Sequence, residues 1–250
     1  MSSRSPTTTN TPIWVTRFHK GFRAALVSPP IAGSKNSVTC AGQLLAFVYS
    51  CMIETIIFDL GGVLIDWDPR HLYRKLIPDE ERMEYFLANI CAHEWNEQHD
   101  AGHPVAEGMK ELAAIHPDWE KEIFAYYERW PEMLGGPIEG TVDILSELHN
   151  AGEQRLLALT NWSAETFPVA RERYDFLNWF ENILVSGEEK MKKPDPRFFQ
   201  LLFERFNVDP AKAVFIDDSA RNIESAQNCG LHTIHFQSPE ALSAELTRLL

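Results

Sequence analysis

Two neighbouring acids, Asp217 and Asp218, directly follow the apolar residues Phe215 and Ile216. Two anions side by side at the end of a buried strand repel each other unless a cation or hydrogen bonds offset the repulsion. A helix that starts at Ser219 could use one of these carboxylates as a cap, but it does not easily account for both. The pair therefore indicates a site for a divalent cation.

Three further polar residues stand at the end of a short apolar run or ahead of a helix. Asp59 lies near the end of the run TIIFDL, which two glycines follow, Thr160 ends the run RLLALT, and Lys193 precedes a proline-containing helix start. Each has an ordinary structural explanation, because an acid can form a turn, a hydroxyl can cap a helix and a lysine can be solvated. Their combination with the acid pair favours a chemical role.

The oxygen-rich residues suit magnesium, which prefers oxygen ligands and keeps part of its water shell. The predicted ligands are a carboxylate oxygen of Asp59, the backbone carbonyl of Gly61 and the carboxylate of Asp218. Asp217 would either ligate the ion or orient the ligands without touching the ion. Mg²⁺ is therefore the predicted cofactor.

Lys193 and Thr160 suit an anionic phosphate. A nucleophile that approaches phosphate needs positive charge to cancel the repulsion, and enzymes accelerate the very slow hydrolysis of phosphate monoesters by up to ~10²¹-fold. Lys193 and the hydroxyl of Thr160 would hold phosphoryl oxygens and stabilise their charge in the transition state. Backbone amides near Gly62 and Asn161 could add donors, as turns and helix starts often do.

These residues are predicted to meet at one edge of a parallel sheet. Short apolar runs alternate with helical patterns, which is typical of an α/β domain. In such sheets ligands lie at the carboxyl ends of the strands, where Asp59, Thr160 and Asp217 would come together. The expected strands are residues 55–60, 155–160, 182–185, 213–216 and 233–236, and helices are expected to start near residues 195, 219 and 238.

Residues 68–134 break this alternation. They are charged, rich in aromatic residues and helical in period, and they contain no convincing strand. An all-helical insert directly after the first strand would lie over the carboxyl end of that strand, so we expect a helical cap. The predicted core comprises residues 52–67 and 135–250. Residues 1–51 are predicted to be a disordered or non-native extension, or alternatively a targeting leader.

Four short signatures, with the sequences DLGGVL, LTNWS, KKPDP and IDDSA, together resemble the motifs of the haloacid dehalogenase-like hydrolase superfamily. The resemblance covers residues 52–250 and is greatest to small sugar-phosphate phosphatases and haloacid-type hydrolases with a helical cap of the first class. It implies a three-layer, Rossmann-like core. It also implies a magnesium-dependent phosphatase that hydrolyses a small phosphorylated metabolite, for example a sugar phosphate, through an aspartyl-phosphate on Asp59.

Gly61 departs from the pattern of this superfamily. Most of its phosphatases carry a second Asp there, two positions after the nucleophile, as general acid and base. Loss of a general acid typically slows a reaction by ~10²–10⁴-fold. A cap residue could substitute, and within residues 95–103 we expect His99 first and Glu97 second. Both could also be ordinary polar residues of a solvated helix end.

Two other functions are open to this sequence. Asp59 could displace halide from a 2-haloacid, a reaction that needs no metal, but the acid pair at 217–218 favours magnesium and phosphate. The chain could also be a non-catalytic binding protein of the same fold, for which Gly61 is the only support.

Charge and composition narrow the class of partner. The formal net charge of −13 argues against a nucleic-acid partner, because phosphate backbones attract cationic surfaces. Residues 36–53 are uncharged but carry too many polar side chains for a good membrane span. The four cysteines form no C-x-x-C pair, which is typical of isolated thiols in a reducing compartment. We therefore expect a cytoplasmic enzyme with a small-molecule substrate, and the sequence indicates no particular oligomeric state.

Overall fold

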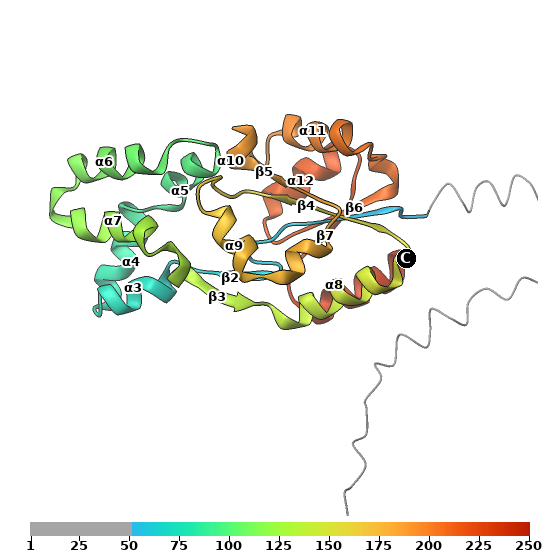
Figure 1. Ribbon diagram of the computed structural model, residues 1–250, viewed down its shortest axis with the longest axis horizontal. Helices are drawn as coiled ribbons and strands as arrows, with labels where there is room; N and C mark the ends of the chain where they lie inside the picture. The colour runs from blue at the N-terminus through green and yellow to red at the C-terminus, as the bar shows by residue number, and fades with distance from the viewer. Residues whose placement is uncertain (1–51) are drawn as a thin grey trace, which may run out of the picture. The chain divides into compact units, whose positions relative to one another are not determined.

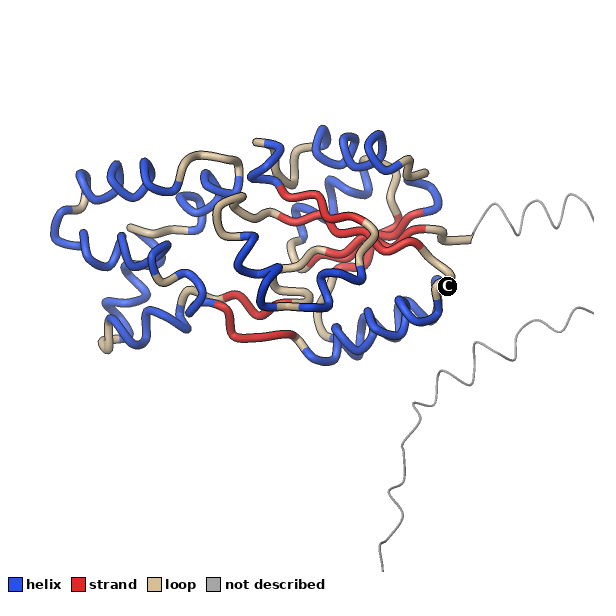
Figure 2. The backbone as a smooth tube through the Cα atoms, in the orientation of Figure 1, coloured by secondary structure: helices blue, strands red, loops and turns tan. Residues whose placement is uncertain are grey.

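The computed structural model of the protein describes residues 52–250. Their centre is a five-stranded sheet in the order β5-β4-β1-β6-β7, with every neighbouring pair parallel. Figure 2 shows these strands gathered in one half of the described chain. The strands are β1 (Thr55–Phe58), β4 (Arg155–Thr160), β5 (Asn182–Val185), β6 (Ala213–Asp217) and β7 (His232–His235).

Side chains of the central strands alternate between two helical layers. In β1, Ile56 and Phe58 belong to one buried cluster, and Ile57 belongs to the other. Figure 1 shows α11 and α12 on one side of the sheet and α8 on the opposite side. The predicted α/β class with a parallel, Rossmann-like sheet is confirmed. The layer helices are α8 (Glu139–Ala151), α11 (Pro196–Phe206), α12 (Ala220–Asn228) and α13 (Pro239–Leu249).

The helix that follows Lys193 shows how the local sequence dictates these elements. Asp195 caps α11 by accepting a hydrogen bond from the backbone amide of Arg197, and Pro196 occupies the first helical turn. Phe199 and Leu202 of its apolar stripe are fully buried against the sheet. The cap and the stripe together fix where α11 begins and which face it packs.

A two-stranded antiparallel sheet, formed by β2 (Ile65–Trp67) and β3 (Leu134–Pro137), brackets the segment between them. The sequence-based list of strands does not include these two, because three or four residues are too short to show alternation; within residues 68–134 only Leu134, the first residue of β3, belongs to a strand. Between the two strands the chain is helical. Its helices are α3 (Arg70–Leu76), α4 (Glu80–Asn89), α5 (His93–Asp100), α6 (Val105–Ile115) and α7 (Glu120–Glu128).

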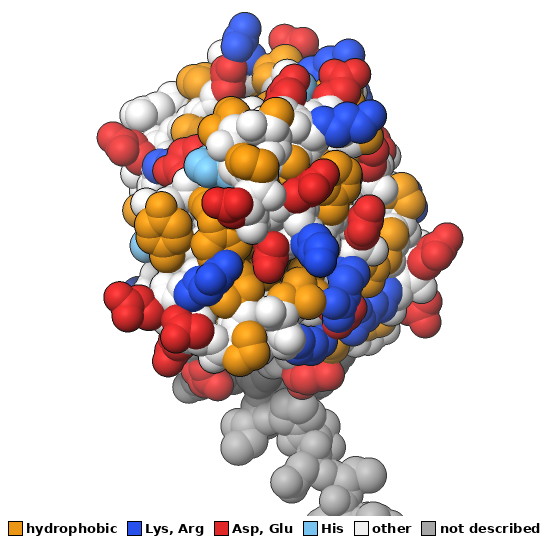
Figure 3. All heavy atoms as spheres, turned by 90° about the vertical axis from the view of Figure 1, so that its left-hand side faces the viewer, with side chains coloured by type: hydrophobic (Ala, Val, Ile, Leu, Met, Phe, Trp, Pro, Cys, Tyr) orange, Lys and Arg blue, Asp and Glu red, His pale blue; other side chains and the backbone are white. Residues whose placement is uncertain are grey.

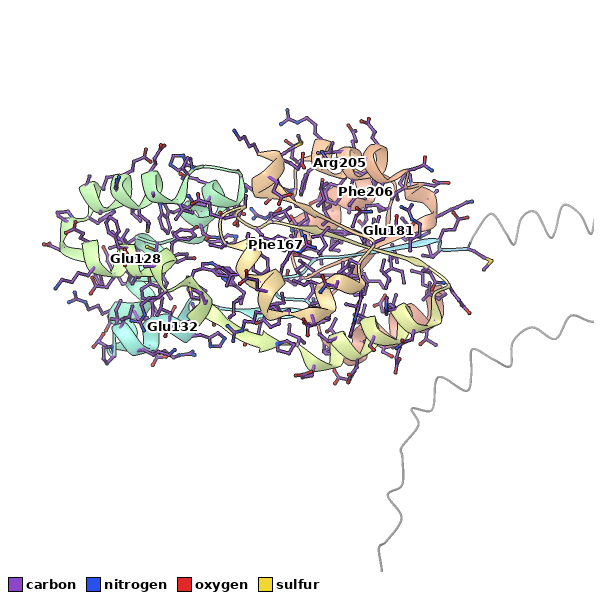
Figure 4. The ribbon with its side chains drawn as sticks, viewed as in Figure 1. Glu128, Glu132, Phe167, Glu181, Arg205 and Phe206 are labelled. Atoms are coloured by element: carbon purple, nitrogen blue, oxygen red, sulfur yellow. The ribbon has the colours of Figure 1, made fainter. Side chains whose placement is uncertain are left out.

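This helical segment lies beyond one end of the large sheet (Figures 1 and 2). Its outer face carries acidic and basic side chains that are interspersed (Figure 3). Phe167, labelled in Figure 4, starts α9 (Phe167–Arg173) where this segment meets the sheet, and its ring lies 5.8 Å from that of Trp162. The boundaries of the core and cap remain a proposal, and the predicted extension 1–51 lies outside the described residues.

The remaining described elements are short. They are α10 (Ser186–Glu189) and four 3₁₀ turns at Pro117–Trp119, Trp130–Met133, Asp175–Trp179 and Pro210–Lys212. Among the helices of residues 52–250, none has the length and apolar character needed to cross a bilayer.

Candidate active site

Three carboxylates meet at the carboxyl ends of β1 and β6. Asp59 follows β1 and donates its backbone N–H to the carbonyl of Ile216, 2.8 Å away, which aligns it with the end of β6. Asp217 is the last residue of β6, and Asp218 follows it. Each of the three acids offers an oxygen within 4.8 Å of the others. The structure thus brings together the acids that the sequence predicted to meet at this edge.

Lys193 lies between two of these acids. Its ammonium Nζ is 2.9 Å from Oδ1 of Asp59 and 2.7 Å from Oδ2 of Asp217, and its side chain is fully buried. Asp217 also accepts hydrogen bonds from the side chain of Asn222 (3.1 Å) and from the backbone amide of Ser219 (2.8 Å). With its oxygens occupied in this way, Asp217 holds Lys193 in place. Asp218 is exposed and makes none of these contacts.

The electrostatics of the centre leave negative charge unbalanced. Burial raises the pKa of Asp59, Lys193 lowers it in part, and the charges of Asp217 and Asp218 raise it further. Burial lowers the pKa of Lys193, but Asp217 and Asp59 outweigh this effect and raise it overall. Three carboxylates outnumber the one ammonium group, so an additional cation would offset the remaining negative charge. Asp59, Gly61 and Asp218, which line one cavity, are the residues that could hold it.

The glycine turn after β1 is shaped around Asp218. Gly62 has a φ of +73°, and a Cβ at this position would collide with the carboxylate of Asp218. Its backbone amide donates to the carbonyl of Ile65 at 2.9 Å, so it closes the turn and is not free for the predicted contact with phosphate. At Gly61, by contrast, a Cβ would meet no atom of residues 52–250 within 4 Å.

The loop after β4 contributes Thr160 and Asn161. Thr160 is 1% exposed, and its hydroxyl has no hydrogen-bond partner in the described part of the chain. A buried unsatisfied hydroxyl is unfavourable by about 1–3 kcal/mol, so this group fits an absent acceptor such as a phosphoryl oxygen. The Asn161 side chain donates to the carbonyl of Lys193 (3.0 Å) and accepts from its amide (2.8 Å). This amide side chain therefore fixes the backbone that carries the lysine.

A cavity of about 490 Å³ opens above these residues, between the sheet edge and the helical segment. Trp67, Trp130 and Trp162 form aromatic parts of its wall, while Trp95 is buried away from it. Its further lining residues include Asp59, Gly61, Gly62, Asn96, Glu97, Asp100, Tyr127, Asn161, Asp218 and Arg221.

His99 is absent from the residues that line this cavity. Its ring is fully buried among those of Trp95, Tyr127 and His103, at centroid distances of 4.9–5.4 Å. Its Nδ1 lies 3.0 Å from the backbone carbonyl of His103, and burial lowers its pKa. An aromatic environment on the inner face of α5 therefore keeps this histidine away from the cavity, and the geometry does not favour its predicted role.

Glu97, the second cap candidate, does line the cavity, but cations surround it. It pairs with Lys192 (2.9 Å), with Arg221 and with His93 (3.2 Å), and its side chain is 12% exposed. Lys192 and Arg221 belong to the sheet-bearing part of the chain, so Glu97 ties α5 to that part. These ion pairs indicate a structural role for Glu97, which is to join the two parts of the chain.

Asp100 and Asn96 on the cavity wall were missed by the sequence-based reasoning. They stand four residues apart on α5, and both are buried although both are polar. Residues at this spacing share one face of a helix, which is the signal that could have identified them. The Asn96 side chain donates to Oδ2 of Asp100 (3.0 Å) and accepts from the hydroxyl of Tyr127 (2.9 Å).

The site thus combines a parallel α/β sheet with an acidic centre at the carboxyl ends of its strands. The family model of haloacid dehalogenase-like hydrolases matches residues 53–230, and the chain belongs to this family. The predicted superfamily and the predicted hydrolase class are therefore confirmed.

Named relatives of this chain include phosphatases. It is 28% identical to the sesquiterpene phosphatase of Aspergillus oryzae (79% of this chain and 96% of that one). It is 25% identical to the phosphorylated carbohydrates phosphatase of Thermotoga maritima (73% and 84%). A shorter match at 34% identity, over 110 residues, is to mouse acyl-CoA dehydrogenase family member 10, of which the chain spans 10%.

Among solved structures, a haloacid dehalogenase family enzyme from Bacteroides thetaiotaomicron resembles this chain with a TM-score of 0.58 at 27% identity. The match covers 74% of this chain and 95% of that one, which was solved in complex with magnesium and inorganic phosphate.

Proposed function

We propose that the chain is a magnesium-dependent phosphatase that hydrolyses a small phosphorylated metabolite through an aspartyl-phosphate on Asp59. One observation carries the proposal: three carboxylates lie within 4.8 Å of one another, beside a single buried ammonium group. Such a cluster is tolerable around a divalent cation and is positioned to act on an anionic substrate. The phosphatases among the relatives and the magnesium and phosphate in the Bacteroides enzyme support the same assignment.

Each residue of the site has its own role in the proposed reaction. Asp59 attacks phosphorus with a carboxylate oxygen, and the bond from phosphorus to the leaving oxygen breaks. Lys193 and the hydroxyl of Thr160, which has no hydrogen-bond partner within residues 52–250, donate to the phosphoryl oxygens as charge moves across them. Asp217 and Asn161 act indirectly, because they hold the side chain and the backbone of Lys193.

Asp59, Gly61 and Asp218 would hold Mg²⁺, which when bound offsets the repulsion between the nucleophile and the phosphate. Asp217 is the weakest candidate ligand, because Lys193, Asn222 and Ser219 already occupy its carboxylate. We therefore propose that Asp217 does not contact the ion and instead positions the residues around it.

The cavity supports a proposal for the substrate class. Its volume of about 490 Å³ and its aromatic wall suit a small alcohol moiety with an apolar or sugar-like face. A screen should therefore compare sugar phosphates with prenyl phosphates, and it should include 2-chloropropionate to test the dehalogenase alternative.

The decisive test of the proposal is the substitution Asp59→Asn, assayed with and without magnesium on the best substrate of that screen. We expect phosphate release to require magnesium and to be abolished in the variant. Thermal unfolding should show that the variant remains folded. Undiminished magnesium-dependent release from Asp59→Asn would defeat the proposal, and halide release without magnesium would favour the dehalogenase.

A matched pair of acids tests the metal assignment. Asp218→Asn should raise the magnesium concentration needed for half-maximal activity, because it removes a ligand charge. Asp195→Asn removes a carboxylate that caps α11 and does not line the cavity, so it should leave the magnesium requirement unchanged. An unchanged requirement in Asp218→Asn would show that Asp218 is not a ligand.

A further inference from the structure

The proposed phosphatase reaction lacks a proton donor among the residues placed so far. When the bond from phosphorus to an alkyl oxygen breaks, the leaving oxygen takes the electron pair and needs a proton. Asp59 is the nucleophile, and Asp218 faces the metal site. Glu97 lines the cavity but is held by two cations, Lys192 and Arg221, which bind a carboxylate and not its acid.

Asp100 is the remaining buried acid on the cavity wall. It is the last residue of α5 and is 9% exposed. The Asn96 side chain holds its Oδ2 at 3.0 Å, and the hydroxyl of Tyr127 holds Asn96 in turn. All three residues line the same cavity as Asp59. This chain of hydrogen bonds fixes the orientation of the carboxyl group, as a group that transfers protons requires.

The surroundings of Asp100 favour its protonated form. Burial raises its pKa to about 7, although the charge of Lys192, a contact with the Ser163 backbone and the charge of Lys193 oppose the shift. Its place at the carboxyl end of α5 acts in the same direction as burial, because the helix dipole disfavours negative charge there. Burial raises the pKa of Tyr126 and Tyr127, and the negative charge of Asp100 adds to the shift in both.

We propose that Asp100 is the general acid and base of the reaction, supplied by α5 in place of an acid beside the nucleophile; the assignment rests on the proposed phosphatase function. In the first half-reaction, Asp59 bonds to phosphorus, the ester bond breaks, and the leaving oxygen takes the proton of Asp100. In the second, water attacks phosphorus, and Asp100 takes a proton from that water. The Asp59 carboxylate leaves with its electron pair, and Asp100 is protonated again.

The space beside Gly61 provides an independent way to test this. A Cβ there would meet no atom of the described residues within 4 Å, its φ is not in the left-handed region, and the residue lines the cavity two positions after Asp59. A carboxyl group introduced by Gly61→Asp would therefore reach the reacting atoms from a second direction. If Asp100 supplies the proton, a carboxyl group at position 61 should replace it.

Asp100→Asn is the main variant, because it keeps the shape and removes the titrating group. With p-nitrophenyl phosphate, whose leaving group needs no proton, we expect an initial burst of nitrophenolate close to that of the wild-type enzyme. The phosphoenzyme should then decay ~10²–10⁴-fold more slowly. With the best alkyl phosphate of the substrate screen, formation of the phosphoenzyme should also fall by ~10²–10⁴-fold.

Glu94→Gln is the matched control, since Glu94 is an exposed acid on the same helix and does not line the cavity. It should leave both half-reactions unchanged. Gly61→Asp in the Asp100→Asn background should restore the decay of the phosphoenzyme at least tenfold. This rescue shows that the slow variant is folded and lacks only a proton-transfer group.

The outcomes separate the two proposals. Decay of the phosphoenzyme at the wild-type rate in Asp100→Asn overturns the role of Asp100 and leaves the phosphatase assignment standing. A slow Asp100→Asn variant that Gly61→Asp does not rescue also overturns it, because the loss is then structural. Absence of any phosphoenzyme in the wild type, with full hydrolysis by Asp59→Asn, defeats the proposed function and this inference with it.

Discussion

Nζ of Lys193 lies 2.7 Å from Oδ2 of Asp217, and both side chains are completely excluded from solvent. A buried ion pair of this kind contributes little net stability when it is intact, because desolvation of the charges offsets their attraction. Removal of one partner is strongly unfavourable, because the other charge then remains buried without compensation. Oδ1 of Asp59 lies 2.9 Å from the same ammonium group. Lys193 therefore affects both the stability of the fold and the charge of the nucleophile.

Lys193→Met should therefore lower the free energy of unfolding by about 3–5 kcal/mol, as well as abolish phosphatase activity. Chemical denaturation of the variant at fixed pH measures this loss. Lys192→Met is the matched control: Lys192 is 24% exposed and pairs with Glu97, so its removal should lower the same free energy by only about 1 kcal/mol. Equal losses in the two variants would contradict a special role for the buried pair.

The stability loss of Lys193→Met should also depend on pH. The folded protein already raises the pKa of Asp59, and removal of the lysine raises it further. A carboxyl group with a raised pKa stabilises the fold while it is protonated, and this contribution is lost as pH rises through the folded pKa. The difference between variant and wild type should therefore be smaller at acidic pH and larger at alkaline pH. A loss that grows on acidification would show that Asp59 is not the affected group.

Gly62→Ala should displace Asp218 and strain the turn. The left-handed φ of +73° is unfavourable for alanine by about 1–3 kcal/mol, and the added methyl group would collide with the Asp218 carboxylate. We expect lower stability and a higher magnesium requirement, measured by denaturation and by titration of activity. Gly61→Ala is the control for the loss of stability, because space is open there and φ is ordinary. If both variants behave alike, the turn does not position Asp218.

The sequence was sufficient to predict the sheet and its acidic edge, because both depend on short-range patterns. The runs that end at Thr160 and Val185 match β4 and β5 residue for residue, since an apolar segment between polar residues marks a buried parallel strand. Asp59 and Asp217 then had to meet, because parallel strands present their carboxyl ends at one edge.

The contents of the helical segment could not be predicted in the same way. Glu97 pairs with Arg221, 124 residues further along the chain, and no local pattern encodes such a contact. His99 and Asp100 are adjacent in sequence, yet packing buries the histidine among aromatic rings and leaves the aspartate on the cavity wall. Only the i,i+4 spacing of Asn96 and Asp100 carried a readable signal.

The pairs that Glu97 makes should stabilise the contact between α5 and the sheet-bearing part in a salt-dependent way. Glu97→Gln should lower the free energy of unfolding by about 1–2 kcal/mol, between the values typical of exposed and buried pairs. This difference should shrink toward ~1 M salt, where the screening length falls to about 3 Å.

The more exposed pair between Arg155 and Glu181 provides the control for this salt dependence. Glu181→Gln should lower the free energy of unfolding by less than about 1 kcal/mol. Denaturation of both variants at low and high salt makes the comparison. A salt-independent loss in Glu97→Gln would indicate that packing, and not charge, joins α5 to the sheet-bearing part.

The role proposed for Asp100 predicts the alkaline side of the pH profile. The reaction with an alkyl phosphate needs Asp100 protonated, and burial raises its pKa to about 7. The kcat/KM for such an ester should therefore fall about tenfold per pH unit above that value. With p-nitrophenyl phosphate the fall should be absent, because no proton is needed. Asp59 acts in the opposite sense: it must be ionised, so its protonation lowers activity on the acidic side of the profile. A bound cation lowers the pKa of Asp59 and shifts this acidic fall to lower pH. Asp100→Asn should remove the alkaline limb for the alkyl ester, and an alkaline limb that survives in this variant would assign the proton to another group.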